Sequence, residues 1–138
     1  MNEHIFTPVG DVMIRDIQTI GAMATVSDAI EAMSRAGVSS LVVERRGELD
    51  EFGLLVVSDI ACKVIAANKS PDRTNVYEIM SKPVLSVPES MDIRNAVRLL
   101  VQFNLSRALV VDDRRSPVGI VTLRDMVLRH GKDNRSSG

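Results

Sequence analysis

The chain has 138 residues, enough for one well-packed domain or for two small units that share a core; its 45% apolar and 25% charged residues exclude the disordered and fibrous classes. A formal net charge of −1 and 3% aromatic residues provide neither the basic excess nor the stacking platforms of a nucleic-acid-binding protein, so we do not expect nucleic acid as a partner. A single cysteine, and no apolar run near the roughly 18 residues of a membrane span, indicate a cytoplasmic protein without a membrane partner.

The first predicted elements are a short extended segment and an amphipathic helix. The extended segment covers Asp16 to Ile20, and Thr25 is then well placed to cap the helix, with Asp28 three residues later completing a capping box. Gly37 stands where a left-handed residue ends a helix. The apolar positions predict one buried stripe, formed by Ala29, Ile30, Ala32, Met33 and Ala36.

Two strands and a second helix follow. Leu41 to Glu44 is predicted to pair with Gly53 to Val57 across a polar loop, and a helix begins near Ser58. Cys62 falls among apolar neighbours on this helix, with no base near it in sequence. We therefore expect a buried structural thiol rather than a nucleophile. Ile60, Val64 and Ile65 supply the predicted apolar stripe of this helix.

The second half of the chain repeats this pattern. A shift of 67 positions places Val12-Met13 on Ile79-Met80 and Ala29-Ile30 on Ala96-Val97, and small length changes in the strands and hairpin then bring Asp59 onto Asp125. The second copy accordingly predicts an extended segment at Pro83 to Val87, a helix capped by Asp92 and ended near Asn104, strands at Ala108 to Asp112 and Val118 to Thr122, and a last helix from about Arg124.

The repeat predicts an α/β fold of two β-α-β-β-α units, at residues 11–67 and 76–130. Residues 68–75 are the predicted linker, and residues 131–138 a disordered tail. One unit alone buries little apolar surface, so we expect the two to pack through their sheets with approximate two-fold symmetry. Such packing would create a cleft with two related pockets.

The stretch from Gly119 to Asp125 is the most informative for function. It combines a hydroxyl at the end of a strand, Thr122, with a carboxylate in the first turn of a helix, Asp125. A carboxylate accepts two hydrogen bonds from a cis-diol, while a helix N-terminus and a hydroxyl favour a phosphate oxygen. Arg107, which follows Ser106 at the start of the neighbouring strand, suits phosphate charge. These residue types together fit a ribonucleotide.

A purely structural interpretation of the same residues stays open. An Asp in a first helical turn is favourable for the helix dipole, and Thr is common at strand ends. Recurrence of the spacing between Gly53 and Asp59 favours the functional interpretation. The chain has no phosphate-loop or dinucleotide-binding glycine motif and no spacing of metal ligands, so we expect neither catalysis nor a metal.

Three motifs carry a family resemblance: Met-Ser-Lys-Pro-Val at 80–84, Ser-Arg-Ala-Leu-Val-Val-Asp at 106–112 and Gly-Ile-Val-Thr-Leu-Arg-Asp at 119–125. With the repeat, they resemble a tandem pair of CBS domains, or Bateman module. The resemblance implies a stand-alone regulatory module, not an enzyme, that needs no cofactor and binds AMP, ADP, ATP or S-adenosylmethionine between its repeats. It also implies a homodimer that signals to a separate, unidentified protein.

The resemblance assigns roles to particular residues. Asp125 would hold the ribose hydroxyls, Thr122 would supply the hydroxyl of the motif, and Arg107 would contact phosphate, beside the motif residues Ser106 and Arg124. The segment around Arg15 to Ile17 would wall the adenine together with Val38. The residues implied for the mirror pocket are Asp59, Ser40, Ser81, Lys82 and Val84.

The first copy departs from the motif. Val56 stands where Thr122 stands in the second copy, and Ser40 stands where Arg107 stands. We therefore expect the Asp125 site to bind more tightly than the Asp59 site. The alternative function is a structural dimerisation module with empty pockets. The sequence leaves open the identity of the ligand and its number of phosphates.

Overall fold

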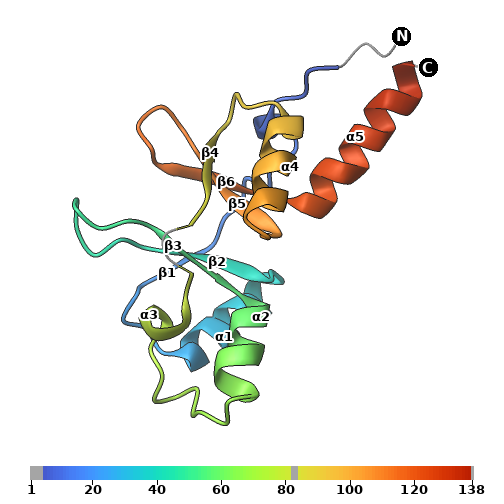
Figure 1. The fold of residues 1–138 in the computed structure, drawn as a ribbon. Coiled ribbons are helices and arrows are strands. Elements are labelled where there is room, and N and C mark those ends of the chain that lie inside the picture. Colours follow the sequence, from blue (N-terminus) through green and yellow to red (C-terminus); the bar gives the residue numbers. More distant parts are fainter. Residues whose placement is uncertain (1–4, 82–83, 138) are drawn as a thin grey trace. The chain divides into compact units, whose positions relative to one another are not determined.

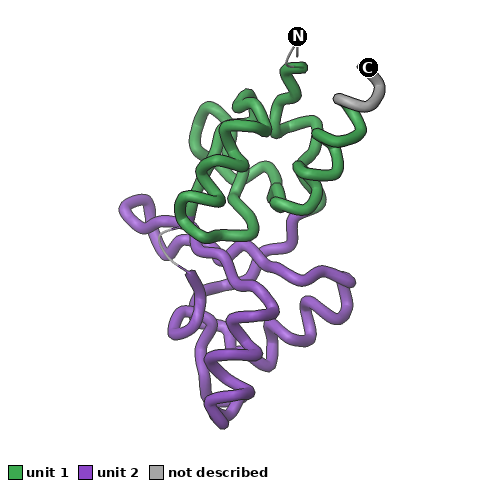
Figure 2. Tube along the Cα trace, turned by 45° about the vertical axis from the view of Figure 1, so that its right-hand side comes forward, with its two compact units in different colours: residues 1–16, 85–138 green, residues 17–84 purple. Residues whose placement is uncertain are grey.

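The computed structural model describes residues 5–81 and 84–137, which fall into two compact units (Figures 1 and 2). Unit 1 comprises residues 1–16 and 85–138, and unit 2 comprises residues 17–84. The fold is α/β, and each unit contains a three-stranded mixed sheet with helices.

The sheet of unit 2 has β2 at its centre. β2 (Ser40–Val43) pairs in parallel with β1 (Thr19–Ile20) and antiparallel with β3 (Gly53–Val56). The predicted hairpin is confirmed to within one residue at each end. Leu41, Val42 and Val43 are fully buried, as expected for a central strand covered on both faces.

The helices of unit 2 are α1 (Val26–Ala36), α2 (Val57–Ile60), the π-helix η2 (Ala61–Ile65) and α3 (Val76–Ile79). The predicted capping box of α1 is confirmed: the Thr25 hydroxyl accepts from the Asp28 N–H at 3.1 Å, and the Asp28 carboxylate accepts from the Thr25 N–H at 3.3 Å. Gly37 ends α1 with φ +68°, a left-handed conformation that glycine adopts without a Cβ penalty.

Parts of the predicted helical faces in unit 2 are wrong, including the burial of Ile65, which is 66% exposed. Ile30 and Ala36 are exposed, so the buried stripe of α1 is narrower than its apolar pattern. Cys62 is also exposed. It lies in η2, where the Ala66 N–H donates to the Ala61 carbonyl five residues back. Cys62 lies two residues after the buried Ile60 and two before the buried Val64, so it falls on the opposite face of the helix and is exposed to solvent.

Unit 1 repeats the same arrangement. Its elements are the 3₁₀ turn η1 (Val9–Asp11), β4 (Ser86–Pro88), α4 (Ile93–Gln102), β5 (Arg107–Val111), β6 (Pro117–Thr122) and α5 (Leu123–Ser137). β5 is central, parallel to β4 and antiparallel to β6. The register slips between Val110 and Val111. The predicted cap Asp92 and the left-handed Asn104 (φ +56°) are both found at the ends of α4.

The two compact units do not follow the two repeats in chain order. The segment that precedes repeat 1 packs in unit 1, where the Val9 N–H donates to the Met91 carbonyl at 2.7 Å. The segment that precedes repeat 2 packs in unit 2, where the Val76 N–H donates to the Ala24 carbonyl at 2.8 Å. Each unit is therefore built from one repeat and the leading segment of the other.

The end of the chain differs from the predicted disordered tail. Helix α5 continues through Ser137 (Figure 1). Asp133 explains part of this extension, because its carboxylate accepts hydrogen bonds from the Thr7 hydroxyl at 2.8 Å and from Arg129 at 3.1 Å. These contacts tie the last turns of α5 to the N-terminal segment of the same unit.

Candidate functional site

The junction between β6 and α5 carries the motif that the sequence singled out. β6 ends at Thr122, whose hydroxyl accepts a hydrogen bond from the Asp125 N–H at 3.1 Å. Thr122 thus caps α5, which fixes Asp125 in its first turn. A hydroxyl that accepts this bond still has its own proton to donate. The Thr122 hydroxyl, as a donor, and the Asp125 carboxylate, as an acceptor, are therefore held at neighbouring positions.

The Asp125 carboxylate is partly exposed and weakly engaged. Its side chain is 33% exposed, and it lies 3.7 Å from the guanidinium of Arg124, whose own side chain is 79% exposed. An ion pair this exposed contributes between about 0 and 1 kcal/mol. The carboxylate oxygens can therefore exchange this contact for the hydrogen bonds of a bound diol at little cost.

The neighbouring strand brings two more predicted residues to the same place. Arg107 lies directly opposite Thr122 in the β5–β6 register. The preceding residue, Ser106, is exposed, and its carbonyl accepts from the Leu123 N–H at 2.8 Å. Unit 1 thus gathers Ser106, Arg107, Thr122, Arg124 and Asp125 at the end of one hairpin.

The N-terminal segment also reaches this sheet, through a residue that the sequence reasoning missed. Ile14 and Ile120 exchange backbone hydrogen bonds of 2.8 and 3.0 Å, so Ile14 lies beside β6. The side chain of Ile14 is 48% exposed, which is high for an isoleucine in a sheet. The signal was present in the repeat, because the 67-residue shift places Ile14 on Ser81 of the predicted mirror pocket.

Unit 2 builds the equivalent constellation with different side chains. Ser40 lies opposite Val56, as Arg107 lies opposite Thr122. Ser81 exchanges backbone hydrogen bonds with Leu54 of β3, as Ile14 does with Ile120. The structure therefore brings Ser40, Asp59 and Ser81 into one unit.

The Asp59 carboxylate is engaged within its own unit, unlike that of Asp125. With Val56 in place of a threonine, one carboxylate oxygen of Asp59 accepts from the Val56 N–H at 3.1 Å. The other oxygen pairs with Lys63 at 3.5 Å, and the Asp59 side chain is only 13% exposed. Both oxygens thus have protein partners, a feature that repeat alignment alone did not reveal.

The remaining predicted residues have separate positions. Val38 follows the end of α1 and packs against the core of unit 2, and Ile17 is the first residue of that unit. Val84 is half-buried just before β4, and Lys82 lies outside the described residues.

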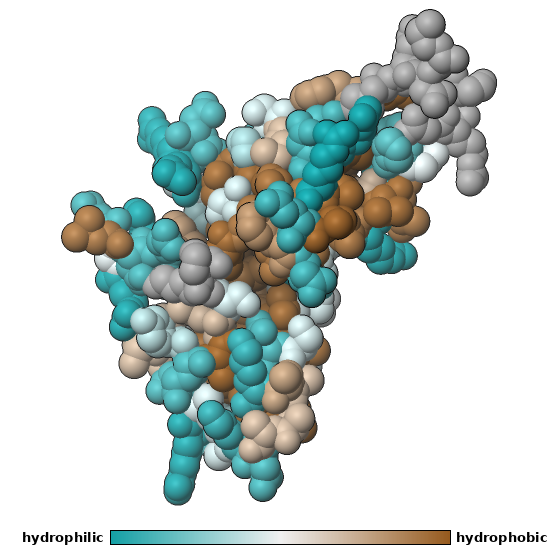
Figure 3. Space-filling model, in the orientation of Figure 1, coloured by the Kyte–Doolittle hydropathy of each residue, from teal (hydrophilic) through white to brown (hydrophobic). Residues whose placement is uncertain are grey.

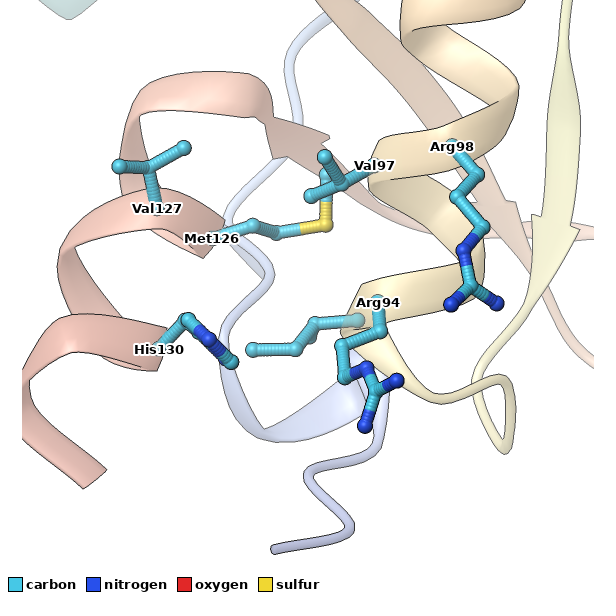
Figure 4. Close-up of a pocket in the computed structure, with 7 residues that line it drawn as sticks. Arg94, Val97, Arg98, Met126, Val127 and His130 are labelled. Atoms are coloured by element: carbon cyan, nitrogen blue, oxygen red, sulfur yellow. The ribbon is translucent and has the colours of Figure 1, made fainter. Parts of the chain in front are cut away.

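A groove between α4 and α5 of unit 1 was not anticipated from sequence. It has a volume of about 280 Å³ and an apolar floor that includes Val97 and Met126, which point toward each other in Figure 4. Arg94 and Arg98 on α4 and His130 on α5 lie around this floor. Figure 3 shows apolar side chains gathered where these two helices adjoin.

The described parts of the chain offer neither a cluster of metal ligands nor a membrane-spanning helix. Within residues 5–81 and 84–137, no three His, Cys, Asp or Glu side chains come close enough together to hold a metal ion. In the same residues, no helix combines the length and the apolar character that crossing a bilayer requires.

Comparison with known proteins identifies the repeat. The CBS domain family matches residues 9–61 and 76–130. An uncharacterized protein of Methanopyrus kandleri is 35% identical over 120 residues, which cover 86% of this chain and 60% of that protein. The CBS domain-containing protein YhcV of Bacillus subtilis is 30% identical over 130 residues, 94% of this chain and 89% of YhcV. This chain thus spans less than two thirds of the Methanopyrus protein but most of YhcV.

Solved structures with the same fold include proteins with bound adenosine compounds. A hexameric CBS-CP12 protein from bloom-forming cyanobacteria has a TM-score of 0.86 at 31% identity, covering 91% of this chain and 69% of that chain. The CBS domain pair of protein MJ0100, in complex with 5′-methylthioadenosine and S-adenosyl-L-methionine, has a TM-score of 0.77 at 26% identity over 94% of this chain and 99% of that chain. The CBS domain of a bacterial CNNM/CorC family Mg²⁺ transporter, in complex with ATP, has a TM-score of 0.75 at 25% identity over 91% and 87%.

The matched residues span most of the chain and fall on both repeats. This chain therefore belongs to the CBS domain family, as a protein with a tandem pair of CBS domains.

Proposed function

We propose that this protein is a regulatory module that binds an adenosine-containing ligand, with the ribose held by Asp125. The observation that carries this proposal is the state of that carboxylate, which lies in the first turn of α5, partly exposed and paired with an exposed arginine. The adenosine compounds bound to MJ0100 and to the CNNM/CorC domain support an adenosyl ligand.

Each residue of the unit 1 cluster has a role in this proposal. The Asp125 carboxylate accepts hydrogen bonds from the two ribose hydroxyls. The Thr122 hydroxyl donates to a phosphate or carboxylate oxygen, and the Arg107 guanidinium supplies the cation on the strand opposite. Ile14, beside β6 in the same unit, supplies apolar surface of the kind that packs on an adenine ring.

The Asp59 site is the weaker of the two in this proposal. Its carboxylate would have to give up the Val56 N–H and Lys63 before it could accept ribose hydroxyls. Unit 2 also has Val56 and Ser40 in place of the hydroxyl and the guanidinium. Asp125 is therefore the principal site. Ligand bound there changes how the module engages a separate protein, and the ligand is not converted in a reaction.

Ligand binding is expected to raise the thermal stability of the protein. Ligand at 100 times its dissociation constant adds about 2.7 kcal/mol to the free energy of unfolding. A thermal-shift panel of AMP, ADP, ATP, S-adenosylmethionine and 5′-methylthioadenosine measures this, with GTP as the control for a nonspecific effect of anions. Unchanged melting temperatures with every adenosyl compound would favour the structural dimerisation module instead.

We also infer that a second copy of the chain covers the groove between α4 and α5. The hexameric CBS-CP12 relative supports self-association. The groove presents apolar surface with Arg94 and Arg98 at its edge, and α1 of another copy offers the exposed acids Asp28 and Glu31 as complementary charge. A symmetric pair of such contacts would close a dimer.

Replacing Val127 by Asp is expected to dissociate this dimer, because it puts a charge on the groove lining. Val127 is already 53% exposed, so the monomer should fold normally. Sedimentation velocity measures the result, and Leu49→Asp, at a fully exposed loop position, is the matched control. A wild-type monomer, or a Val127→Asp variant that still dimerises, would refute this interface.

A further inference from the structure

Three charged side chains of α5 lie on one stripe of the helix, four residues apart. Asp125 is the proposed ribose ligand, Arg129 follows it by one turn, and Asp133 follows Arg129 by another. A residue at the centre of such a stripe can pair with either neighbour. In the structure Arg129 Nε contacts Asp133 Oδ1 at 3.1 Å, so the arginine is directed toward the C-terminal end of α5 and away from Asp125.

This choice runs against the intrinsic preference of an isolated helix. An acid placed four residues before a base stabilises a helix more than the reverse order does. Asp125 would therefore be the better partner for Arg129 if nothing else acted. The preference must be overcome by contacts from outside α5.

The N-terminal segment of unit 1 provides those contacts. The buried Thr7 donates from its hydroxyl to Asp133 Oδ2 at 2.8 Å, and Arg129 also donates to the Asp11 carbonyl at 3.5 Å. The Thr7 hydrogen bond, followed by the hydrogen bond and charge of Arg129, lowers the pKa of Asp133, which keeps this carboxyl ionised. Thr7 and Asp11 thus fix the two groups in their observed pairing.

Unit 2 lacks an acid at the position of Asp133, and its basic residue pairs with the other carboxylate. Lys63 matches Arg129 in the repeat, but Ala67 stands where Asp133 stands. Lys63 donates to the Ile79 carbonyl at 3.0 Å, as Arg129 donates to that of Asp11, yet its ion pair is with Asp59, four residues before it. Thr74, which matches Thr7, donates to the Ser70 carbonyl instead. The cation at the position of Arg129 therefore occupies the carboxylate at the position of Asp125.

We propose that Thr7 and Asp133 are positioning residues that hold Arg129 off Asp125 and so keep the ligand-binding carboxylate open. This inference rests on the proposed function, because it concerns access to the same site. It assigns a role to the last turns of α5 and to Thr7, neither of which contributes a ligand contact of its own. The difference between Asp133 and Ala67 then accounts for one open site and one closed site in a single chain.

A double-mutant cycle tests the proposal. Asp133→Ala releases Arg129 to pair with Asp125, which should weaken the binding of ATP and S-adenosylmethionine roughly two- to fivefold, the range of a partly exposed ion pair. Arg129→Met removes the competitor and should leave the affinity unchanged. The double variant should bind as the wild type does, within error. Isothermal titration calorimetry resolves differences of this size.

Thr7→Val is a milder version of the same test, because it removes one hydroxyl without changing the volume of a buried side chain. It should weaken binding in the same direction as Asp133→Ala but less. Thermal unfolding of each variant without ligand monitors any fraying of α5.

The rescue by Arg129→Met separates a positioning role from a structural one. If Asp133 only anchors the end of α5, the double variant will bind as weakly as Asp133→Ala or more weakly, and the proposal is overturned. An unchanged affinity for Asp133→Ala also overturns it. If the wild-type protein itself binds none of AMP, ADP, ATP, S-adenosylmethionine and 5′-methylthioadenosine, the proposed function has failed, which is a different outcome.

Discussion

Replacing Asp125 by Ala is expected to weaken the binding of adenosyl ligands by at least about 100-fold. The carboxylate accepts two hydrogen bonds from the ribose in our proposal, and each bond to a charged group contributes about 1.5–3 kcal/mol. Without ligand, the variant should lose only about 0.5 kcal/mol of stability, the contribution of an acid in the first turn of a helix. Calorimetric titration gives the first quantity and urea denaturation gives the second.

Asp59→Ala is the matched control, and its expected pattern is the reverse. Asp59 caps the Val56 N–H and pairs with Lys63, so its removal should cost about 1 kcal/mol of stability. The affinity of the principal site should stay within about twofold of the wild-type value. If Asp59→Ala abolishes binding and Asp125→Ala does not, the assignment of the two sites is inverted.

Gly119→Ala is expected to lower the free energy of unfolding by about 2–3 kcal/mol, the upper part of the range for overpacked cores. A Cβ at this position would lie 2.6 Å from Met13 Sδ and 2.9 Å from the Ile14 carbonyl oxygen. The methionine can change rotamer, but the carbonyl belongs to the backbone that pairs with β6. Relief therefore requires the N-terminal segment to shift. Urea denaturation followed by circular dichroism measures the loss.

The repeat offers Gly53→Ala as an internal comparison. A Cβ at Gly53 would lie 2.6 Å from Met80 Sδ, but its next contact is a side-chain carbon of Val43 at 3.3 Å. A flexible methionine can move away from it, so we expect a loss of about 1 kcal/mol or less. Equal losses in the two variants would contradict the role given to the Ile14 backbone.

The hairpin strands and the ends of α1 and α4 were predictable because each depends on local sequence. Thr25 and Asp28 form the expected capping box, and Gly37 and Asn104 have the expected positive φ. The 67-residue shift also predicted that Arg107 and Ser40 occupy equivalent positions, which the two hairpin registers confirm.

Features that depend on distant contacts were not predictable in the same way. The helical continuation of α5 depends on Thr7, which is more than 120 residues away in sequence. The leading segments pack with the opposite repeats through backbone hydrogen bonds, and these leave little trace in side-chain patterns.

For the candidate site too, locally determined features were predictable and features set by distant contacts were not. Asp125, Thr122 and Arg107 could be selected from residue chemistry and spacing, because a hairpin and a capped helix fix their neighbourhood. The difference in engagement between Asp125 and Asp59 could not, because it depends on which way Arg129 and Lys63 turn. That direction is set by Asp133 and Ala67, at positions that the sequence analysis treated as a tail and a linker boundary.

A crystal structure of the protein with ATP or S-adenosylmethionine bound tests the central claim most directly. Our account predicts both ribose hydroxyls within hydrogen-bond distance of the Asp125 carboxylate, with Arg129 still paired to Asp133. A ligand whose ribose contacts neither oxygen of Asp125 would contradict it.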